Sequence, residues 1–201
     1  MILGIETSGG RCAVALVDGE RIVRRVREME RGHAEALFPL IDEALAAAGA
    51  VYRDLSRIGV CTGPGSFTGI RVGIAAARGL ALGLGVPAVG ISRLEALATE
   101  AAPGRPTCVR VRGPGGAAYV QDFDADGRAD GPPRLVGADW AAPAGRALVG
   151  PGGTLPGALP DPAAIARLAA GRPPGERPAP LYLRDAGAAP PREAPPPLLD
   201  P

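Results

Sequence analysis

The chain has 201 residues, a formal net charge of +1, and 46% hydrophobic against 21% charged residues. This composition excludes a disordered chain and is typical of a globular protein of one domain or two small lobes. The balanced charge gives no strong electrostatic sign of nucleic-acid or membrane binding, so any RNA contact is expected to depend mostly on a partner. All 22 basic residues are arginine, so the lysines of P-loop, protein-kinase and Schiff-base chemistry are missing.

Three cysteines, Cys12, Cys61 and Cys108, are widely spaced and form no CxxC pair. An odd, scattered set argues against a disulfide framework and against a zinc knuckle, so reduced thiols in the cytoplasm are expected. The start of the sequence lacks the basic and apolar segments of a signal peptide. Charged residues or repeated glycines interrupt every long apolar stretch, so no membrane association is expected.

Three strands are predicted first, because short alternating stretches are separated by tight turns such as Asp18-Gly19. They are Ile2–Glu6, Cys12–Val17 and Ile22–Arg27. An amphipathic stripe then predicts a helix over His33–Ala48, with Gly49 as its C-terminal stop. The next elements are a strand at Ile58–Cys61, a helix at Thr68–Leu84, a strand at Ala88–Ile91 and a helix at Leu94–Ala102.

Proline content divides the chain, since only Pro39, Pro64 and Pro87 of the 23 prolines precede residue 100. This shift predicts a first lobe over residues 1–100, a smaller second lobe over 101–189 and a Pro-rich tail over 190–201. The second lobe is expected to contain strands at Thr107–Val111, Ala118–Asp124 and Ala147–Val149, and a helix that begins at Asp161-Pro162 and ends at Gly171. The order of elements indicates a mixed α/β fold.

The most specific motif is the glycine-rich segment TGPGSFTG at Thr62–Gly69, between a predicted strand and a predicted helix. Its glycines permit tight turns and close backbone approach, and Ser66 or Thr68 can cap the helix. Such a turn can hold an anion with backbone N–H groups, or it can be a tight connection without a ligand. The absence of a following lysine or acidic metal ligand favours a structural loop that includes Gly63, Gly65, Ser66, Thr68 and Gly69.

The helix after this loop, GIRVGIAAARGLALGLG, is apolar around its circumference apart from Arg71 and Arg78. A helix of this kind needs cover on more than one side. One side can meet the sheet of its own lobe, and small residues such as Gly73 and Ala77 would let another helix approach closely. The pattern leaves two alternatives, a helix buried within one chain or a helix that also contacts a second protein.

Catalytic groups are scarce in the sequence. The turn Glu6–Gly10 resembles the phosphate-binding hairpin of the actin, sugar-kinase and Hsp70 superfamily, but its residues fit that hairpin only loosely and favour an ordinary hairpin. A second phosphate hairpin and an acidic Mg²⁺ site are missing, and Arg110 and Arg112 stand where a carboxylate would be needed. His33, the only histidine, has Leu37 in place of a second ligand one turn on, so a capping or packing role is expected. No catalytic residue, metal site or cofactor is predicted.

Four segments together resemble the TsaB (YeaZ) family. They are ILGIETS at Ile2–Ser8, HAEALFPLIDEAL at His33–Leu45, GPGSFTGIRVGIAAARGLALGLGVPAVGISRLEALA at Gly63–Ala98, and PLYLR at Pro180–Arg184. The resemblance implies an actin-like (ASKHA, ribonuclease-H-like) fold of two lobes, the second reduced. It also implies a non-catalytic subunit that heterodimerises with TsaD and supports, with the ATPase TsaE, transfer of threonylcarbamoyl to the adenosine beside the tRNA anticodon.

In that family the contact with TsaD is a helix bundle, which corresponds here to the helices His33–Ala48 and Thr68–Leu84. The residues expected to bind the partner are Leu37, Ile41, Leu45, Ile70, Arg71, Gly73, Ile74, Ala77 and Arg78. The tRNA would be reached through the complex, and a homodimer through the same surface is plausible when the chain is alone. The alternatives are a small ATPase or kinase of the actin-like superfamily, and a peptidase, for which the sequence offers no nucleophile and no metal triad.

Overall fold

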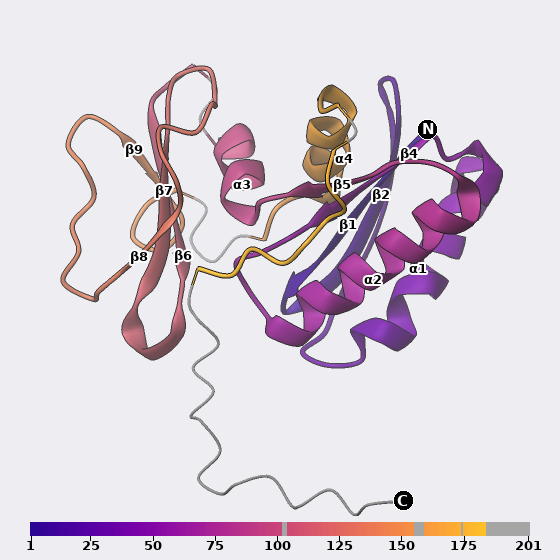
Figure 1. Ribbon diagram of the computed structural model, residues 1–201, viewed down its shortest axis with the longest axis horizontal. Helices are drawn as coiled ribbons and strands as arrows, with labels where there is room; N and C mark the ends of the chain where they lie inside the picture. Colours follow the sequence, from indigo (N-terminus) through magenta and orange to yellow (C-terminus); the bar gives the residue numbers. More distant parts are fainter. Residues whose placement is uncertain (102–103, 155–158, 174, 184–201) are drawn as a thin grey trace, which may run out of the picture.

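The computed structural model describes residues 1–101, 104–154, 159–173 and 175–183. Within these residues the chain forms two lobes, each built around one β-sheet (Figure 1). The predicted Pro-rich tail at 190–201 lies outside the described residues, as does Arg184 of the PLYLR segment.

The sheet of the first lobe has five strands in the order β3-β2-β1-β4-β5. They are β1 (Ile2–Gly9), β2 (Arg11–Asp18), β3 (Arg21–Glu28), β4 (Arg57–Cys61) and β5 (Ala88–Ile91), and all five lie where the sequence predicts strands. β2 pairs antiparallel with β1 and β3, whereas β4 pairs parallel with β1 and β5 and therefore needs helical crossovers. Strands β1, β2 and β4 are buried on both faces, which explains their nearly continuous apolar runs.

Two helices, α1 (His33–Ala48) and α2 (Phe67–Leu84), lie next to each other on one face of this sheet (Figure 1). Each buries one apolar side in a common core with β1, β2 and β4. α1 ends at Gly49, which has a φ of 68° and is the predicted stop. α2 is capped by Ser66, whose Oγ accepts a hydrogen bond from the Gly69 N–H, so Ser66 and not Thr68 is the cap.

The sheet of the second lobe has four strands in the order β8-β7-β6-β9. They are β6 (Thr107–Arg112), β7 (Ala118–Phe123), β8 (Arg134–Val136) and β9 (Ala147–Val149). The chain also has two short 3₁₀ helices, η1 (Tyr52–Asp54) in the first lobe and η2 (Pro114–Gly116) between β6 and β7. The sequence does not predict β8, because three residues are too few to show an alternating pattern. α3 (Arg93–Ala101) covers the inner face of this sheet, where Leu94 and Leu97 pack with Val109 and Phe123.

Two helices each pack on the sheet of one lobe although their neighbours in the sequence belong to the other lobe. α3 follows the strands of the first lobe but packs on the second-lobe sheet, through β6, β7 and β9. α4 (Pro162–Gly171) follows the second lobe but covers the free face of the first-lobe sheet, where Ile165 and Ala169 pack with Cys61 and Ile91. Each sheet thus takes a helix from beyond residue 100 in the sequence, or from before it, to cover an apolar face.

α4 approaches the first-lobe sheet most closely at two glycines. A Cβ atom at Gly4 of β1 would lie 1.9 Å from the carbonyl oxygen of Pro162, and one at Gly59 of β4 would lie 2.8 Å from the Ala169 Cβ. Side chains at either position would push the helix away from the sheet. Glycine is therefore required by the distance between the two backbones.

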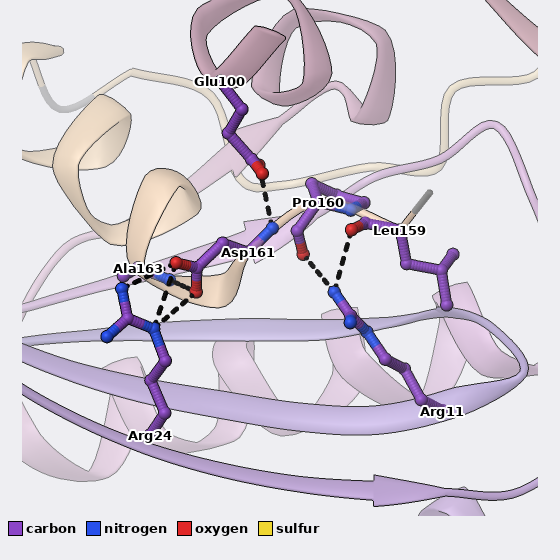
Figure 2. A network of polar contacts seen from close by, with 7 residues as sticks. All are labelled: Arg11, Arg24, Glu100, Leu159, Pro160, Asp161 and Ala163. Atoms are coloured by element: carbon purple, nitrogen blue, oxygen red, sulfur yellow. Dashed lines mark hydrogen bonds and ion pairs between the residues drawn. The ribbon is translucent and has the colours of Figure 1, made fainter. Parts of the chain in front are cut away.

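A polar network fastens the start of α4 to the first lobe and to α3 (Figure 2). Asp161 caps α4 by accepting a hydrogen bond from the Ala163 N–H, and its carboxylate pairs with the Arg24 guanidinium of β3 at 2.7 Å. Arg11 of β2 donates to the carbonyls of the two residues before Asp161, and Glu100 of α3 accepts from the Asp161 N–H. Burial acts to raise the pKa of Asp161, but the hydrogen bonds from Arg24 and Ala163 outweigh it and hold the pKa below its ordinary value.

Candidate partner-binding site

The glycine-rich loop before α2 packs directly against the end of β1. The Ser66 N–H donates to the Ser8 carbonyl at 2.7 Å, and the Thr7 hydroxyl donates to the Gly69 carbonyl at 2.8 Å. A Cβ atom at Gly65 would lie 2.1 Å from the Ser8 oxygen, and one at Gly69 would lie 2.0 Å from the Thr7 oxygen. These glycines let two backbones meet, and the N–H groups of Ser66 and Gly69 are engaged within the chain, which favours a tight connection over an anion cradle.

The polar side chains at the end of β1 are also used inside the lobe. Glu6, Thr7 and Ser8 are all buried. Glu6 Oε1 accepts hydrogen bonds from the Ser8 N–H at 2.5 Å and from the Ser8 hydroxyl at 2.6 Å. The pKa of the neighbouring Cys61 thiol is raised well above its ordinary value, first by burial and then by the Glu6 charge. This hairpin therefore offers a nucleotide neither a free hydroxyl nor a reactive thiolate.

His33 has a structural position at the start of α1. It is buried, and its Nε2 lies 3.0 Å from the carbonyl oxygen of Gly9, so it joins the helix to the turn between β1 and β2. Gly32, in the left-handed conformation, is the N-cap residue of α1. Across the described part of the chain, no group of three His, Cys, Asp or Glu side chains is placed to hold a metal ion.

A cavity of about 740 Å³ lies between the start of α2 and the segment 180–183. Arg71 stands at its edge, with its guanidinium carbon 3.7 Å from the ring centroid of Phe67 and 5.9 Å from that of Tyr182. Arg71 Nε also donates to the Tyr182 hydroxyl oxygen at 3.0 Å. Both rings are more than half exposed, so this end of α2 presents a cation between two aromatic side chains beside an open cavity.

The nine residues predicted for partner binding fall into two groups. Seven of them are buried in the first lobe: Leu37, Ile41, Leu45, Ile70, Gly73, Ile74 and Ala77. They face the sheet and the common core, and their part in partner binding stays a prediction. Only Arg71 and Arg78 are exposed. A helix that is apolar all round gives no sign in its sequence of which side meets the sheet.

The exposed side of α2 is formed largely by other residues. They recur at steps of three and four and are here called the α2 stripe: Thr68, Arg71, Ala75, Arg78 and Leu82. Leu82 is 82% exposed. Among the described residues, α2 is the one helix long and apolar enough to cross a membrane by length and composition, yet only 28% of it is buried. The helical spacing between Ala75 and Leu82 is the signal that could have identified this side.

Comparison with known proteins places these features in a family. The family model for TsaD, described as tRNA N6-adenosine threonylcarbamoyltransferase, matches residues 7–131. The tRNA threonylcarbamoyladenosine biosynthesis protein TsaB of Escherichia coli is 36% identical over 100 residues, which are 50% of this chain and 43% of that protein. The TsaB protein of Haemophilus influenzae is 40% identical over 102 residues, or 50% of this chain and 42% of that protein. The chain thus matches less than half the length of these curated relatives.

The structural match extends further than the sequence match. The solved structure of YeaZ from Pseudomonas aeruginosa is 25% identical and superposes on 90% of this chain and 99% of that chain, with a TM-score of 0.76. The two-lobed α/β arrangement is the actin-like fold that the sequence predicts. Because the family model covers more than half of the chain, and the relatives named TsaB and YeaZ agree with it, the chain belongs to the tRNA N6-adenosine threonylcarbamoyltransferase family and, within it, to the TsaB (YeaZ) group.

Proposed function

We propose that the chain is a non-catalytic, cytoplasmic subunit that binds TsaD through the exposed sides of α1 and α2. Together with TsaE, it would support transfer of threonylcarbamoyl to the adenosine next to the anticodon of tRNA. Membership of the TsaB (YeaZ) group supports this proposal, since the curated relatives are named as threonylcarbamoyladenosine biosynthesis proteins. The structural observation that carries it is that α2 is apolar over its length although only 28% of it is buried in the described part of the chain.

The α2 stripe has the character of a surface that receives another helix. Ala75 is exposed, and the neighbouring Gly79 has nothing within 4 Å of a Cβ placed on it, so a second backbone can approach closely. Burial of Leu82, now 82% exposed, against a partner would contribute about 1.5–3 kcal/mol. On the adjacent α1, Phe38 is 43% exposed and extends the apolar surface.

The chemistry of the first lobe favours a supporting role over catalysis. The Thr7 hydroxyl donates to the Gly69 carbonyl, and the Ser8 hydroxyl donates to the Glu6 carboxylate, whose same oxygen also accepts from the Ser8 N–H. Under the alternative hypothesis of a small ATPase or kinase, the purified chain would hydrolyse Mg²⁺–ATP and lose that activity with Glu6→Gln. We expect no hydrolysis by the wild-type chain, because this hairpin lacks free groups to hold phosphate.

The proposal is tested by mixing the chain with TsaD from the same organism and measuring the mass of the complex by size-exclusion chromatography with light scattering. Ala75→Glu should weaken the complex at least about 100-fold, because the longer side chain would hold a closely packed second helix away from α2, and such overpacking with loss of the contact costs about 3 kcal/mol. Ala170→Glu is the matched control, since Ala170 is an exposed alanine on α4, on the other side of the first-lobe sheet. Equal binding by the wild type and the folded Ala75→Glu variant would exclude the α2 stripe as the contact.

The same surface is proposed to mediate a homodimer when the chain is alone. An exposed apolar side chain such as Leu82, beside small residues that admit a second helix, promotes self-association until a partner covers it. Light scattering of the isolated chain over a range of concentrations measures this, and Ala75→Glu should shift the species to monomer. A dimer unaffected by Ala75→Glu would use another surface.

A further inference from the structure

The outer face of the second-lobe sheet, opposite α3, carries no helix among the described residues (Figure 1). Along β6, Val109 and Val111 pack in the cluster with α3, so the alternation of the strand places Arg110 and Arg112 on the outer face. Trp140, from the loop after β8, packs against the apolar cluster of this outer face. The face therefore combines two arginines with the only tryptophan of the chain.

Neither of these arginines is neutralised within the described part of the chain. Arg110 and Arg112 form no ion pair there, and the Arg110 guanidinium carbon lies 5.9 Å from the ring centroid of Trp140. Arg134 on the same face differs, because its guanidinium is paired with Asp122 at 2.7 Å. A cavity of about 340 Å³ lies between Arg110, Arg112 and the glycine-rich turn that follows β6.

The surroundings of this cavity are open and hold little negative charge. Two aspartates in the loop after β7, Asp126 and Asp130, are paired with arginines of their own. That loop starts beside the Thr107 end of β6, whereas Arg112 is at the other end of the strand. Asp139 is exposed near Trp140 but makes no ion pair with described arginines. Positive charge is therefore concentrated at one end of this face, although the whole chain is nearly neutral.

We propose that this face binds the phosphate backbone of RNA, with Arg110 and Arg112 as the phosphate contacts. The inference rests on the proposed function in tRNA modification, for which it names a contact with the RNA substrate. Residues two apart on a strand are about 6.6 Å apart, so the two guanidinium groups can bind neighbouring phosphates, each through paired hydrogen bonds. Trp140 adds an aromatic surface on which an unpaired base can stack. An acidic protein would use the arginines but not the aromatic surface, so RNA is the better chemical match.

Fluorescence anisotropy of a labelled tRNA transcript, titrated with the full chain, tests this contact without a partner protein. At physiological salt, about 150 mM, we expect a Kd on the order of 1–100 µM, the range of sequence-independent binding, and tighter binding at lower salt. Arg110→Ala/Arg112→Ala should raise the Kd at least about tenfold. It should also reduce the slope of log Kd against log salt by about 1.4–1.8, since each phosphate contact contributes about 0.7–0.9. Arg110→Lys/Arg112→Lys should keep most of the slope but lose part of the affinity, because lysine does not bind phosphate through a fork.

Arg128→Ala is the matched control, because Arg128 is an exposed arginine of the same lobe that is already paired with Asp126 at 3.1 Å. Unchanged affinity and slope in the double alanine variant would overturn the inference, as would a wild-type chain that does not bind tRNA at low salt. A parallel titration with labelled polyglutamate identifies the competing class of partner: loss of peptide binding with unchanged tRNA binding would assign the face to an acidic protein. Binding to TsaD is measured separately with Ala75→Glu, so failure of the heterodimer and failure of the RNA contact are distinguishable.

Discussion

Replacement of Gly69 by alanine should destabilise the chain, whereas the same replacement at Gly79, on the same helix, should stabilise it. At Gly69 the new methyl group would lie 2.0 Å from the Thr7 carbonyl oxygen, a backbone atom of β1 that cannot move without displacing the strand. At Gly79 nothing lies within 4 Å of the new methyl group. Neither glycine has a positive φ, so alanine can adopt both backbone conformations.

The magnitudes follow from these two environments. Alanine is more favourable than glycine inside a helix by about 0.8–1 kcal/mol, which is the whole effect expected at Gly79. At Gly69 the overpacked contact costs about 1–3 kcal/mol, and weakening of the Thr7–Gly69 hydrogen bond costs about 0.5–1.5 kcal/mol more. The net loss at Gly69 is therefore roughly 1–3 kcal/mol, equivalent to a Tm lower by about 2–12 °C for a chain of this length.

Urea unfolding followed by circular dichroism measures the free energy of unfolding of both variants against the wild type. The informative quantity is the difference between the two variants, since both make the same chemical change within α2. A Gly69→Ala variant as stable as Gly79→Ala would refute the argument that contact with β1 requires this glycine. The loop would then have room for a side chain, and binding of an anion by the N–H groups at the start of α2 would again be possible as an alternative to a purely structural loop.

Three further predictions concern the links between elements and the buried thiols. Asp161→Asn keeps the cap of α4 but loses the charge pair with Arg24, so it should lower the unfolding free energy by about 0.5–1 kcal/mol at neutral pH. The native pKa of Asp161 lies below its unfolded value, so the difference in unfolding free energy between wild type and variant should persist above about pH 4 and shrink as the pH falls further. Urea unfolding at several pH values measures this difference, and a difference that does not change with pH would contradict the prediction. Arg24→Ala should increase hydrogen exchange in α4, whereas Arg25→Ala, which removes the adjacent half-buried arginine beside Glu43, should not. Equal exchange in both variants would remove the fastening role of Arg24. The three cysteines should react with a disulfide reagent only after unfolding, since all three are buried. Burial also raises the pKa of the Cys12 thiol to about 11 and that of the Cys108 thiol to about 12. Rapid labelling of the native chain would show that the lobes open readily.

Local patterns in the sequence predicted most of the elements, because their signals lie within a few residues. The periodicity and the stop at Gly49 place α1 at the bounds that the structure has, and Asp161-Pro162 marks the start of α4. The packing partners of α3 and α4 could not be predicted in this way, since they depend on contacts between segments far apart in the chain. The same limit applies to α2, whose helix was predicted but whose exposed side was not. Binding to TsaD and TsaE stays a prediction, as does the location of the chain in the cell.

The crossing of α3 and α4 between the lobes has a consequence for how the chain can acquire its structure during synthesis. The first-lobe sheet is complete once β5 has emerged from the ribosome, but its second face waits for α4, which begins at Pro162. Until α4 is made, the nascent chain exposes the face of β1 and β4 that α4 later covers, where Gly4 and Gly59 allow the helix to approach the sheet closely. A fragment that ends near residue 100 would keep that face uncovered permanently, and its α3 would have no sheet to pack on. We therefore expect the two lobes to fold as one cooperative unit. The half of the chain that matches its relatives in sequence should not fold stably as an isolated fragment.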